Sequence, residues 1–512
     1  MKRLIAILFL VVVSTILYGL TIRGFEGNPF SDKINRNLSE SPGPFESSHE
    51  RAPYALTYSL VENGSFALNK ELADFASPDT VIKDDTFYII FPPGISLLAM
   101  PFYNIGKAYS AAQLITFAGM TLFALFNLVL VYTISKHVFS IPTNLSLFSA
   151  LIFGFATTSW SFASSLYQHH TTTFFVLTSF LAAWLYKTRL RTKWIWASWI
   201  WFSLGISVWL DYPSVILFAP IIFFMTLSSL KLKKVGDNFK IKIILIPLIT
   251  SVIFISLAAF HGYYNHVNFG GWKNLAQLEP RYDTKLLNET TDEKKLDEIA
   301  KAEKTKSIEG VATENQFFRG FYILTIAPDK GVFFFSPILL LAVLGIVQSF
   351  KVIKKKLLEL ITFSSIFFIN IFFYSSWGDP WGGWAYGPRY LIPSMAVLSI
   401  FTVIWLWINR HNIIVRIIAS VLFIYSAAIA TLGAVTTTIT PPKVEADFLK
   451  LKYGFFNNWE VFINGKSGSF FYNKFLDNYV DLTQFYSIIL IFISVYGLLL
   501  LFIKTSSRKD GN

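Results

Sequence analysis

The sequence predicts an all-α polytopic membrane protein. Hydrophobic residues make up 53% of its 512 residues and charged residues only 15%, whereas soluble domains average about 25% charged residues. One soluble core cannot hide this excess of apolar side chains, because single cores stop growing near about 250 to 300 residues. The composition excludes a soluble multidomain enzyme and a disordered protein. The absence of cysteine excludes disulfide scaffolds, thiolate metal sites and cysteine nucleophiles.

Apolar runs long enough to cross a bilayer, which takes about 20 residues at helical rise, recur along the whole chain. Twelve such runs predict a bundle of about twelve transmembrane helices. The first follows Met1-Lys2-Arg3 and ends in Tyr18-Gly19-Leu20-Thr21 without a clean cleavage site, so we expect a retained helix rather than a signal peptide. The predicted spans are residues 4–21, 111–134, 145–166, 171–186, 194–210, 213–230, 243–261, 331–350, 357–375, 391–408, 413–434 and 485–503.

Clusters of Lys and Arg set the predicted orientation, because such clusters beside membrane helices resist translocation. With the N-terminus in the cytoplasm, the cytoplasmic segments hold 21 Lys and Arg against two Asp, and the C-terminus is cytoplasmic as well. The net charge of +12 is therefore a topology signal. We expect a multi-pass protein of the plasma or inner membrane, with membrane lipids around it and no nucleic acid as a partner.

Three segments between the spans are too long to be turns, because ordinary connections run to about six residues. They are residues 22–110, 262–330 and 435–484, and all three fall on the extracytoplasmic face. Residues 1–434 are expected to form one module, 435–484 a lid or an acceptor platform, and 485–512 the last helix and tail. Residues 284–310 alternate charges with a few leucines and isoleucines, which indicates a surface helix or a lid. We expect any chemistry on this face.

The first long segment carries an acidic start followed by an amphipathic helix, from Glu46 through Glu50, Arg51 and Tyr54 to Glu62. A carboxylate just before a helix is stabilised in its ionised form by the positive end of the helix dipole, which suits a general base. The alternative is structural: Glu50 or Ser48 only caps the helix.

A second motif follows at residues 83–103, where Asp84 and Asp85 precede Pro92-Pro93-Gly94. The paired prolines and the glycine end any strand and start a helix. The free amides at such a helix start, with Ser96 nearby, are suited to hold a phosphate.

The order of these motifs resembles the GT-C superfamily of membrane glycosyltransferases, and within it the protein O-mannosyltransferases and the aminoarabinose-lipid A transferases. The resemblance covers residues 1 to about 410 and rests on order and topology more than on identity. The motifs that carry it are the Glu50 region, residues 88–103, the end of the fifth span at 205–213, Lys330-Gly331 with Ser336-Pro337, and the loop Trp381 to Pro393.

The resemblance implies a GT-C-like bundle that transfers a sugar from a polyprenyl-phosphate carrier to an acceptor on the outer face. In that family the acid before the first amphipathic helix is an Asp that takes the acceptor proton, and Glu50 occupies the matching place. Pro53 stands where the family usually has a basic residue. Glu46 is the alternative base.

Several cations and aromatic rings are candidates for binding the lipid phosphate and the sugar. Arg389 is the leading cation because its planar fork suits phosphate oxygens. Lys330 resembles a basic residue found there in relatives. The alternative for Arg389 is an interfacial snorkelling role. The other candidates in these roles are Arg51, Arg281, Trp384 and Tyr386.

Ionisable residues also gather at the predicted outer ends of the third and fifth spans, at His169, His170 and Asp211. Ionisable groups beside a membrane core are functional candidates. Together with Asp84 or Asp85 they are able to bind a divalent metal. The alternative to metal binding is that His169 or His170 orients the acceptor or the phosphate. The sequence assigns no metal ligand and no required cofactor.

These observations predict a glycosyltransferase, and no ATP drive is indicated because no phosphate-binding GxxxxGK motif occurs. Its donor would be a lipid-linked sugar and its acceptor a glycan, a lipid or a protein, with inversion at the anomeric carbon since one carboxylate suffices. A polytopic transporter or a lipid-linked glycan flippase is the alternative. Transporters usually place charges near the midplane and show repeated halves, and neither feature is evident in this sequence.

Overall fold

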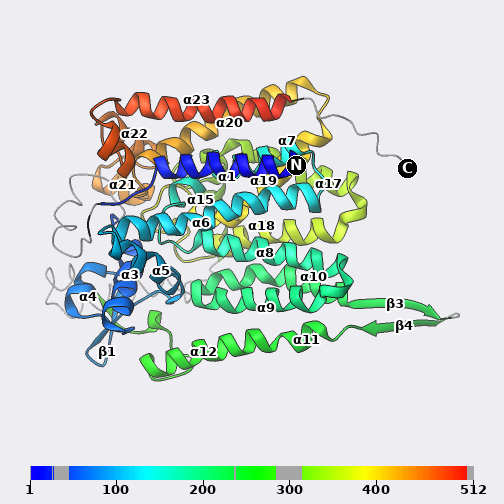
Figure 1. Ribbon diagram of the computed structural model, residues 1–512, viewed down its shortest axis with the longest axis horizontal. Helices are drawn as coiled ribbons and strands as arrows, with labels where there is room; N and C mark the ends of the chain where they lie inside the picture. Colours follow the sequence, from blue (N-terminus) through cyan, green and yellow to red (C-terminus); the bar gives the residue numbers. More distant parts are fainter. Residues whose placement is uncertain (1, 26, 28–44, 236–237, 284–313, 504–512) are drawn as a thin grey trace.

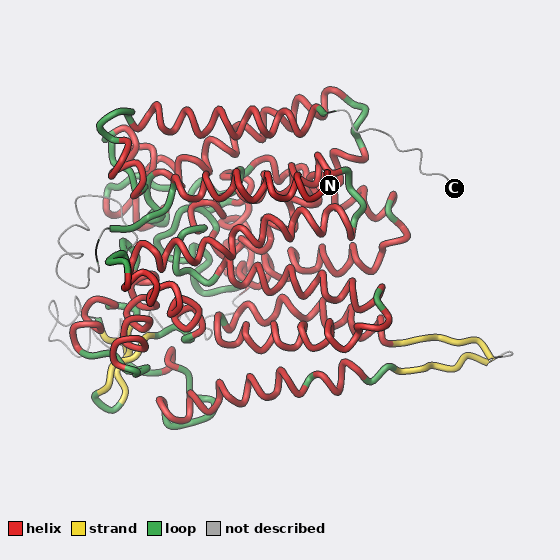
Figure 2. Tube along the Cα trace, viewed as in Figure 1, coloured by secondary structure: helices red, strands yellow, loops and turns green. Residues whose placement is uncertain are grey.

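The computed structural model describes residues 2–25, 27, 45–235, 238–283 and 314–503. Its helices run alongside one another in a bundle (Figures 1 and 2). Each of the twelve predicted spans overlaps a helix for at least part of its length. The helices at these spans are α1 (Lys2–Leu20), α6 (Ala112–Thr133), α7 (Thr143–Phe155), α8 (His169–Thr188), α9 (Lys193–Leu210), η5 (Tyr212–Phe218) with α10 (Ala219–Ser229), α11 (Ile246–Thr250) with α12 (Val252–Phe269), η8 (Pro337–Leu339) with α17 (Leu340–Val352), α18 (Leu357–Ser375), α19 (Ile392–Ile408), α20 (Ile413–Val435) and α23 (Leu482–Phe502).

Seven of the helical stretches in the described chain are long and apolar enough to cross a membrane, judged by length and composition. Three further apolar helices, Ile5–Leu20, Thr143–Phe155 and Pro337–Val352, are shorter. The all-α polytopic prediction is confirmed at this level: the protein is a helical bundle with several candidate membrane spans.

The predicted span 145–166 is wrong in its second half. Helix α7 ends at Phe155, and a buried 3-10 turn, η3 (Thr158–Phe162), follows. The hydroxyls of Thr157 and Ser159 both donate to the carbonyl of Phe153, at 2.7 and 2.6 Å. Side chains that bond to nearby backbone in this way compete with the helical hydrogen bonds. The chain therefore leaves the helix inside the protein and not at its surface.

The predicted span 243–261 is also shifted. Residues up to Ile243 belong to a hairpin of β3 (Leu230–Val235) and β4 (Asn238–Ile243), which pair antiparallel. The helix begins at Ile246 and ends at Phe269, where Gly270 takes a positive φ of 75°. Alternation of apolar residues and Lys in Leu230–Val235 has the period of a strand. The second long outer segment therefore starts near residue 270.

The long segments gather at one end of the bundle (Figure 1). The described parts of that end are mostly short elements, whereas the hairpin β3–β4, the start of α1 and the end of α23 lie toward the opposite end. The predicted surface helix or lid at 284–310 lies outside the described residues. The described elements at the end where the long segments gather are α3 (Ser48–Tyr58), η1 (Ser59–Asn63), α4 (Lys70–Ala76), α5 (Gly94–Ala108), a sheet of order β2–β1–β5 (Thr86–Ile89, Thr80–Lys83, Arg281–Tyr282), η6 (Ala276–Leu278), α15 (Glu314–Thr325), α16 (Val332–Phe335), η10 (Arg389–Leu391), α21 (Lys443–Leu449), α22 (Phe455–Ile463) and η11 (Tyr472–Leu476).

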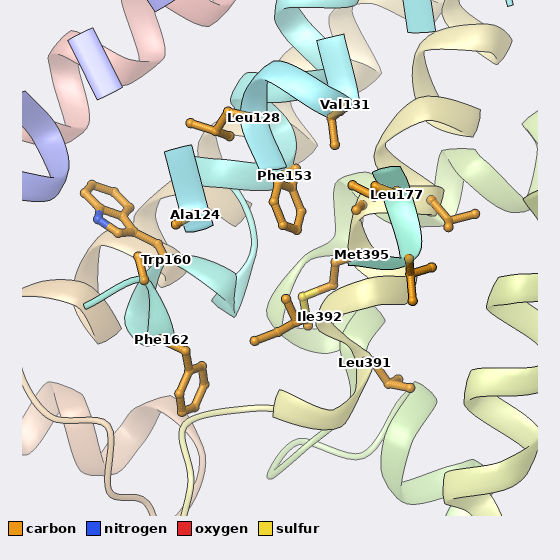
Figure 3. Packing of buried hydrophobic residues seen from close by; sticks show 14 of the residues in the cluster. Ala124, Leu128, Val131, Phe153, Trp160, Phe162, Leu177, Leu391, Ile392 and Met395 are labelled. Atoms are coloured by element: carbon orange, nitrogen blue, oxygen red, sulfur yellow. The ribbon is translucent and has the colours of Figure 1, made fainter. Parts of the chain in front are cut away.

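Helix α19 is the centre of the core. Every residue from Ile392 to Leu406 is buried, and α19 packs against α7, α8, α17 and α18. Figure 3 shows Ile392 and Met395 of α19 among side chains of α6, α7, η3 and α8. Because η10 directly precedes α19, this packing also fixes the position of Arg389 just before the first turn of α19.

Close packing of α17 on α19 predicts a large effect of a small substitution. A Cβ on Gly345 would fall on the carbonyl oxygen of Phe401, so the two helices would have to separate. We expect Gly345→Ala to destabilise the fold by about 1–3 kcal/mol, measured as a lower apparent melting temperature in detergent. Gly19→Ala in α1 is the matched control, because a Cβ there meets nothing within 4 Å. Equal melting temperatures for the two variants would contradict the expectation.

Candidate active site

Glu50 is the central residue of the candidate site. It lies in the first turn of α3, which is capped by Ser47, whose hydroxyl accepts a hydrogen bond from the amide of His49 at 3.1 Å. Neither Glu50 nor Ser48 is therefore the cap. Glu50 is 0% exposed, and within the described chain neither carboxylate oxygen accepts a well-formed hydrogen bond. The backbone of Leu166 acts on this carboxyl as a weak hydrogen-bond donor, and the carboxylate keeps acceptor capacity for a substrate.

Burial dominates the protonation of Glu50. Loss of hydration raises the pKa of this carboxyl well above 4.5, and the nearby Glu46 carboxylate acts in the same direction. The Arg23 and Arg389 guanidinium groups oppose this effect and lower the pKa. A carboxyl whose pKa is raised above its ordinary value, with two cations nearby, is suited to take up a proton from a substrate.

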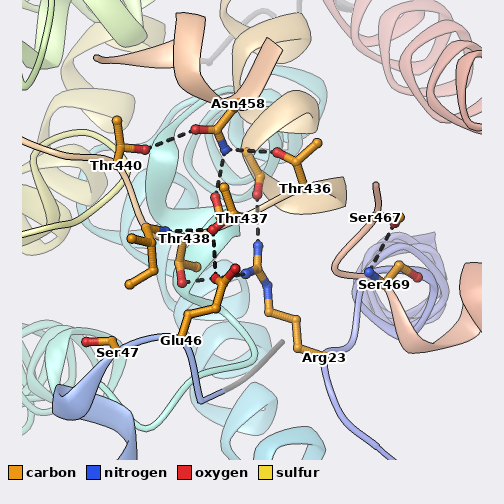
Figure 4. Close-up of polar contacts among 12 residues, drawn as sticks. Arg23, Glu46, Ser47, Thr436, Thr437, Thr438, Thr440, Asn458, Ser467 and Ser469 are labelled. Atoms are coloured by element: carbon orange, nitrogen blue, oxygen red, sulfur yellow. Dashed lines mark hydrogen bonds and ion pairs between the residues drawn. The ribbon is translucent and has the colours of Figure 1, made fainter. Parts of the chain in front are cut away.

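Glu46 is held by protein groups instead. Its Oε2 accepts a hydrogen bond from the hydroxyl of Thr437 at 2.7 Å and lies 3.7 Å from Nη1 of Arg23. Arg23 in turn donates to the carbonyl of Gly433 at 3.0 Å. Figure 4 shows this network between the end of α1, the chain before α3 and residues 436–440. The structure thus separates the two predicted bases into one paired and one unpaired carboxylate.

Segment 435–484 supplies much of this network. Asn458 in α22 accepts from the hydroxyl of Thr440 at 3.0 Å and donates to the carbonyl of Thr437 at 2.7 Å (Figure 4). The hydroxyl of Ser469 donates to the carbonyl of Leu20 at 2.6 Å. The segment therefore braces the end of α1 and the residues that hold Glu46.

Arg389 lies beside Glu50 at the start of α19. It is 7% exposed, and its Nε has no hydrogen-bond partner in the part of the chain that the structure describes. Its guanidinium carbon lies 4.6 Å from the centre of the Tyr167 ring and 5.5 Å from that of Tyr390. Stacking on aromatic faces holds the planar cation while leaving N–H groups free for an anion.

The two predicted histidines have different environments. His170 is used by the fold: its Nε2 donates to the carbonyl of Ser159 at 2.8 Å, and Asn127 donates to its carbonyl at 2.9 Å. His169 is buried, and its Nε2 has no hydrogen-bond partner among the described residues. Its ring lies 5.9 Å from that of Tyr390. Only His169 is therefore available to a ligand at the site.

Asp211 belongs to the same cluster of side chains as Arg389. It follows the last residue of α9, and burial raises its pKa to about 6. The side chains of Gln168 and Tyr374 act on its carboxylate as hydrogen-bond donors, and Arg389 as a neighbouring cation. The ring of Tyr374 stacks on that of Tyr390 at 4.3 Å, which connects Asp211 to the residues around Arg389.

Lys330 is fully buried and donates to the carbonyls of Ala385 and, at 3.2 Å, Thr440. Burial lowers its pKa to about 7, although the Asp329 carboxylate opposes the shift. Its two carbonyl partners join the loop before Arg389 to segment 435–484. These contacts of Lys330 are therefore structural.

Trp384 and Tyr386 likewise bond to the fold. The indole of Trp384 donates to Glu445 of α21, and the hydroxyl of Tyr386 donates to the carbonyl of Ile429 at 2.7 Å. Tyr386 is completely buried against Phe335. Of the two, only Trp384 is open to a ligand.

Four residues of the first long segment that the sequence proposed for the site lie outside the cluster around Glu50 and Arg389. Asp84 and Asp85 form the exposed turn between β1 and β2, both with positive φ. Arg51 is half-buried and donates to the carbonyl of Ser77 at 2.8 Å. Tyr54 packs in the core against Phe45. For Arg51 the physical reason is that consecutive side chains on an α-helix point in different directions, so it does not share the direction of Glu50.

Ser96 is also part of the scaffold. It is buried, and its hydroxyl donates to the carbonyl of Pro53 at 3.0 Å. The start of α5 is closed as well, because Gly94 packs directly on the backbone of Trp209. The predicted phosphate site at this helix start is therefore blocked by the end of α9.

Sequence reasoning missed several residues of the cluster: Arg23, His49, Tyr167, Gln168, Tyr374 and Tyr390. One signal was available for Arg23, since a lone Arg directly after the first span on the predicted outer side runs against the positive-inside rule. The others come from separate segments and become neighbours only in the fold. Among the described residues, no group of three or more His, Asp or Glu side chains is arranged to hold a metal ion.

Comparison with solved structures places this arrangement in a fold class. ArnT from Cupriavidus metallidurans in the apo state matches with a TM-score of 0.50 at 12% identity, over 96% of this chain and 76% of that chain. The structure titled ArnT bound to undecaprenyl phosphate gives a TM-score of 0.47 at 11% identity, with the same coverage. An oligosaccharyltransferase from Archaeoglobus fulgidus gives 0.44 at 12% identity, over 86% of this chain and 57% of that chain.

The chain therefore has a GT-C-like fold, as its sequence motifs indicated. At these identities the likeness concerns the fold alone. No protein-family model and no curated protein sequence matches the chain.

Proposed function

We propose that this protein is an integral membrane glycosyltransferase that moves a sugar from a polyprenyl-phosphate carrier to an acceptor on the extracytoplasmic face. The observation that carries the proposal is the buried carboxylate of Glu50, which has no well-formed hydrogen bond among the described residues and feels the charge of Arg389, at the end of a GT-C-like bundle where the described parts of the long segments gather. The fold resembles that of ArnT, which has also been solved bound to undecaprenyl phosphate. The acceptor is a hydroxyl of a glycan, a lipid or a protein.

The proposed reaction needs one base and one anion-stabilising group. Glu50 takes the proton of the acceptor hydroxyl while its oxygen forms a bond to the anomeric carbon. The bond from that carbon to the phosphate oxygen breaks, and the lipid phosphate keeps the electron pair. Arg389 donates to the departing phosphate. A single displacement inverts the anomeric configuration.

Release of free polyprenyl phosphate tests the proposal. The purified protein is incubated with a panel of polyprenyl-phospho-sugars and candidate acceptors, with and without a chelator, beside Glu50→Gln. Turnover of one donor that is lost in Glu50→Gln supports the proposal, and the chelator arm reports whether a divalent metal is required. No turnover of any donor, together with movement of labelled lipid across liposomes, would establish the transporter alternative.

The pH dependence of turnover should follow Glu50. The base must be deprotonated, so we expect kcat/KM to fall as the pH falls through a Glu50 pKa that lies above 4.5. Arg23 exerts the largest cationic effect that lowers this pKa, so Arg23→Met should move the acidic limb to higher pH. Thr438→Val is the control, because it removes only a 3.5 Å contact to Arg23. Identical acidic limbs in wild type and Arg23→Met would contradict this role.

A further inference from the structure

His49 is a residue next to Glu50 for which the proposed reaction has no use. Its ring is held between two aromatic side chains, with ring centres 4.0 Å from Phe91 and 4.7 Å from Tyr167. The Tyr167 ring is nearly parallel to it, at 15°. Tyr167 also contacts Arg389 and donates to the hydroxyl of Ser47 at 2.9 Å. The imidazole is therefore fixed in orientation at the edge of the candidate site.

A hydrogen bond defines which nitrogen of His49 carries the proton. Nε2 of His49 lies 3.1 Å from the amide oxygen of Gln168. That oxygen only accepts, so Nε2 must donate. Gln168 is held in this orientation because its amide nitrogen faces the Asp211 carboxylate, which only accepts from it. Asp211 and Gln168 thus select one tautomer of the imidazole.

This tautomer leaves Nδ1 of His49 with a lone pair. Within the described chain, the hydrogen bond of the His49 ring is the one that Nε2 makes with Gln168. Loss of hydration and the neighbouring Arg389 guanidinium lower the pKa of His49 well below 6.5, while the bond to Gln168 opposes the shift. The ring is therefore neutral, and the fold leaves Nδ1 as an acceptor in a half-buried side chain. An acceptor of this kind favours a ligand that brings the donor.

We propose that His49 is a substrate-binding residue whose Nδ1 accepts a hydrogen bond from a substrate hydroxyl next to the one that Glu50 deprotonates. The inference rests on the proposed function and adds a specificity contact to it. A hydroxyl of the transferred sugar and a hydroxyl of the acceptor share this chemistry, and the experiment distinguishes them. Gln168 and Asp211 act through His49 as positioning residues.

The tautomer is tested without turnover. Histidine labelled with nitrogen-15 reports ring protonation by NMR in detergent, and the His49 signal is the one that disappears in His49→Phe. We expect a neutral ring with the proton on Nε2 at pH 6, and a mixture of tautomers in Gln168→Leu. A positively charged ring at pH 6, or a proton on Nδ1, would overturn the inference whatever the enzyme assay shows.

The contact itself is tested with monodeoxy donors and monodeoxy acceptors. His49→Phe keeps an aromatic ring between Phe91 and Tyr167 but removes the acceptor, and we expect it to lower kcat/KM roughly 10- to 100-fold. With the wild type, removal of the hydroxyl that binds His49 should lower kcat/KM by a similar factor. With His49→Phe, removal of the same hydroxyl should cause almost no further loss of kcat/KM. Whether that substrate is a donor or an acceptor identifies which hydroxyl binds.

Two outcomes separate the inference from the proposed function. His266 is exposed at the end of α12, so His266→Phe should keep wild-type kcat/KM for every substrate in the series. If the wild type is active but every deoxy substrate loses the same factor in wild type and His49→Phe, the contact does not exist. If the wild type turns over no donor, the proposed function fails, and the NMR experiment still decides the state of His49.

Discussion

Glu50→Gln should abolish sugar transfer while leaving the fold intact. The amide has almost the shape of the carboxylate but cannot take a proton, so we expect kcat to fall by about 10²–10⁴-fold. Stability should be unchanged or slightly higher, because the substitution removes a buried charge that the protein leaves without a hydrogen bond. Polyprenyl phosphate release and an apparent melting temperature measure the two effects on the same preparation.

Glu46→Gln is the matched control for this result. Its carboxylate pairs with Arg23 and Thr437, so we expect a much smaller loss of kcat and a lower melting temperature. The opposite pattern, with transfer lost in Glu46→Gln and retained in Glu50→Gln, would make Glu46 the base. The two variants therefore decide between the two carboxylates that the sequence proposed.

Arg389→Ala should have the second largest effect. The substitution removes the N–H groups for the lipid phosphate and also removes a cation that lowers the pKa of Glu50. We expect kcat/KM to fall by about 10²–10³-fold at neutral pH, with part of the loss recovered at higher pH, where Glu50 is again deprotonated. Steady-state kinetics over a pH series measures both effects.

Arg410→Ala provides the comparison for a cation outside the site. Arg410 lies between α19 and α20, at the end of α19 away from Arg389, and donates to the carbonyl of Trp407 at 3.2 Å. Its removal should leave kcat/KM within about twofold of wild type, since surface charges contribute little. Equal losses in Arg389→Ala and Arg410→Ala would indicate a general effect of charge and not phosphate binding.

Most of the helical bundle could be predicted because apolar runs of bilayer length leave few structural alternatives. The errors have local causes. Hydroxyl groups of Thr157 and Ser159 end α7 early by bonding to the carbonyl of Phe153, and a strand-like alternation before residue 243 forms a hairpin. Hydropathy is averaged over a window of residues, so it detects neither the side-chain hydrogen bonds that end α7 nor the strand-like alternation before residue 243.

The candidate site was predicted in part. Glu50, Arg389, His169 and Asp211 are brought together, while Asp84, Asp85, Arg51, Tyr54 and Ser96 lie elsewhere or serve the fold. A helix turn separates side chains that are adjacent in sequence, so nearness to Glu50 in the chain did not mean nearness in space.

The sequence by itself determined the membrane class, most of the helix positions and the long segments that carry the ionisable residues, because these follow from local composition and from the length of the apolar runs. Only the tertiary structure distinguished Glu46, which Arg23 and Thr437 hold, from Glu50, which no protein group hydrogen-bonds well. It alone joined His49 to Gln168. Pairing and burial depend on contacts between residues tens to hundreds of positions apart, and such contacts leave no local pattern in a single sequence.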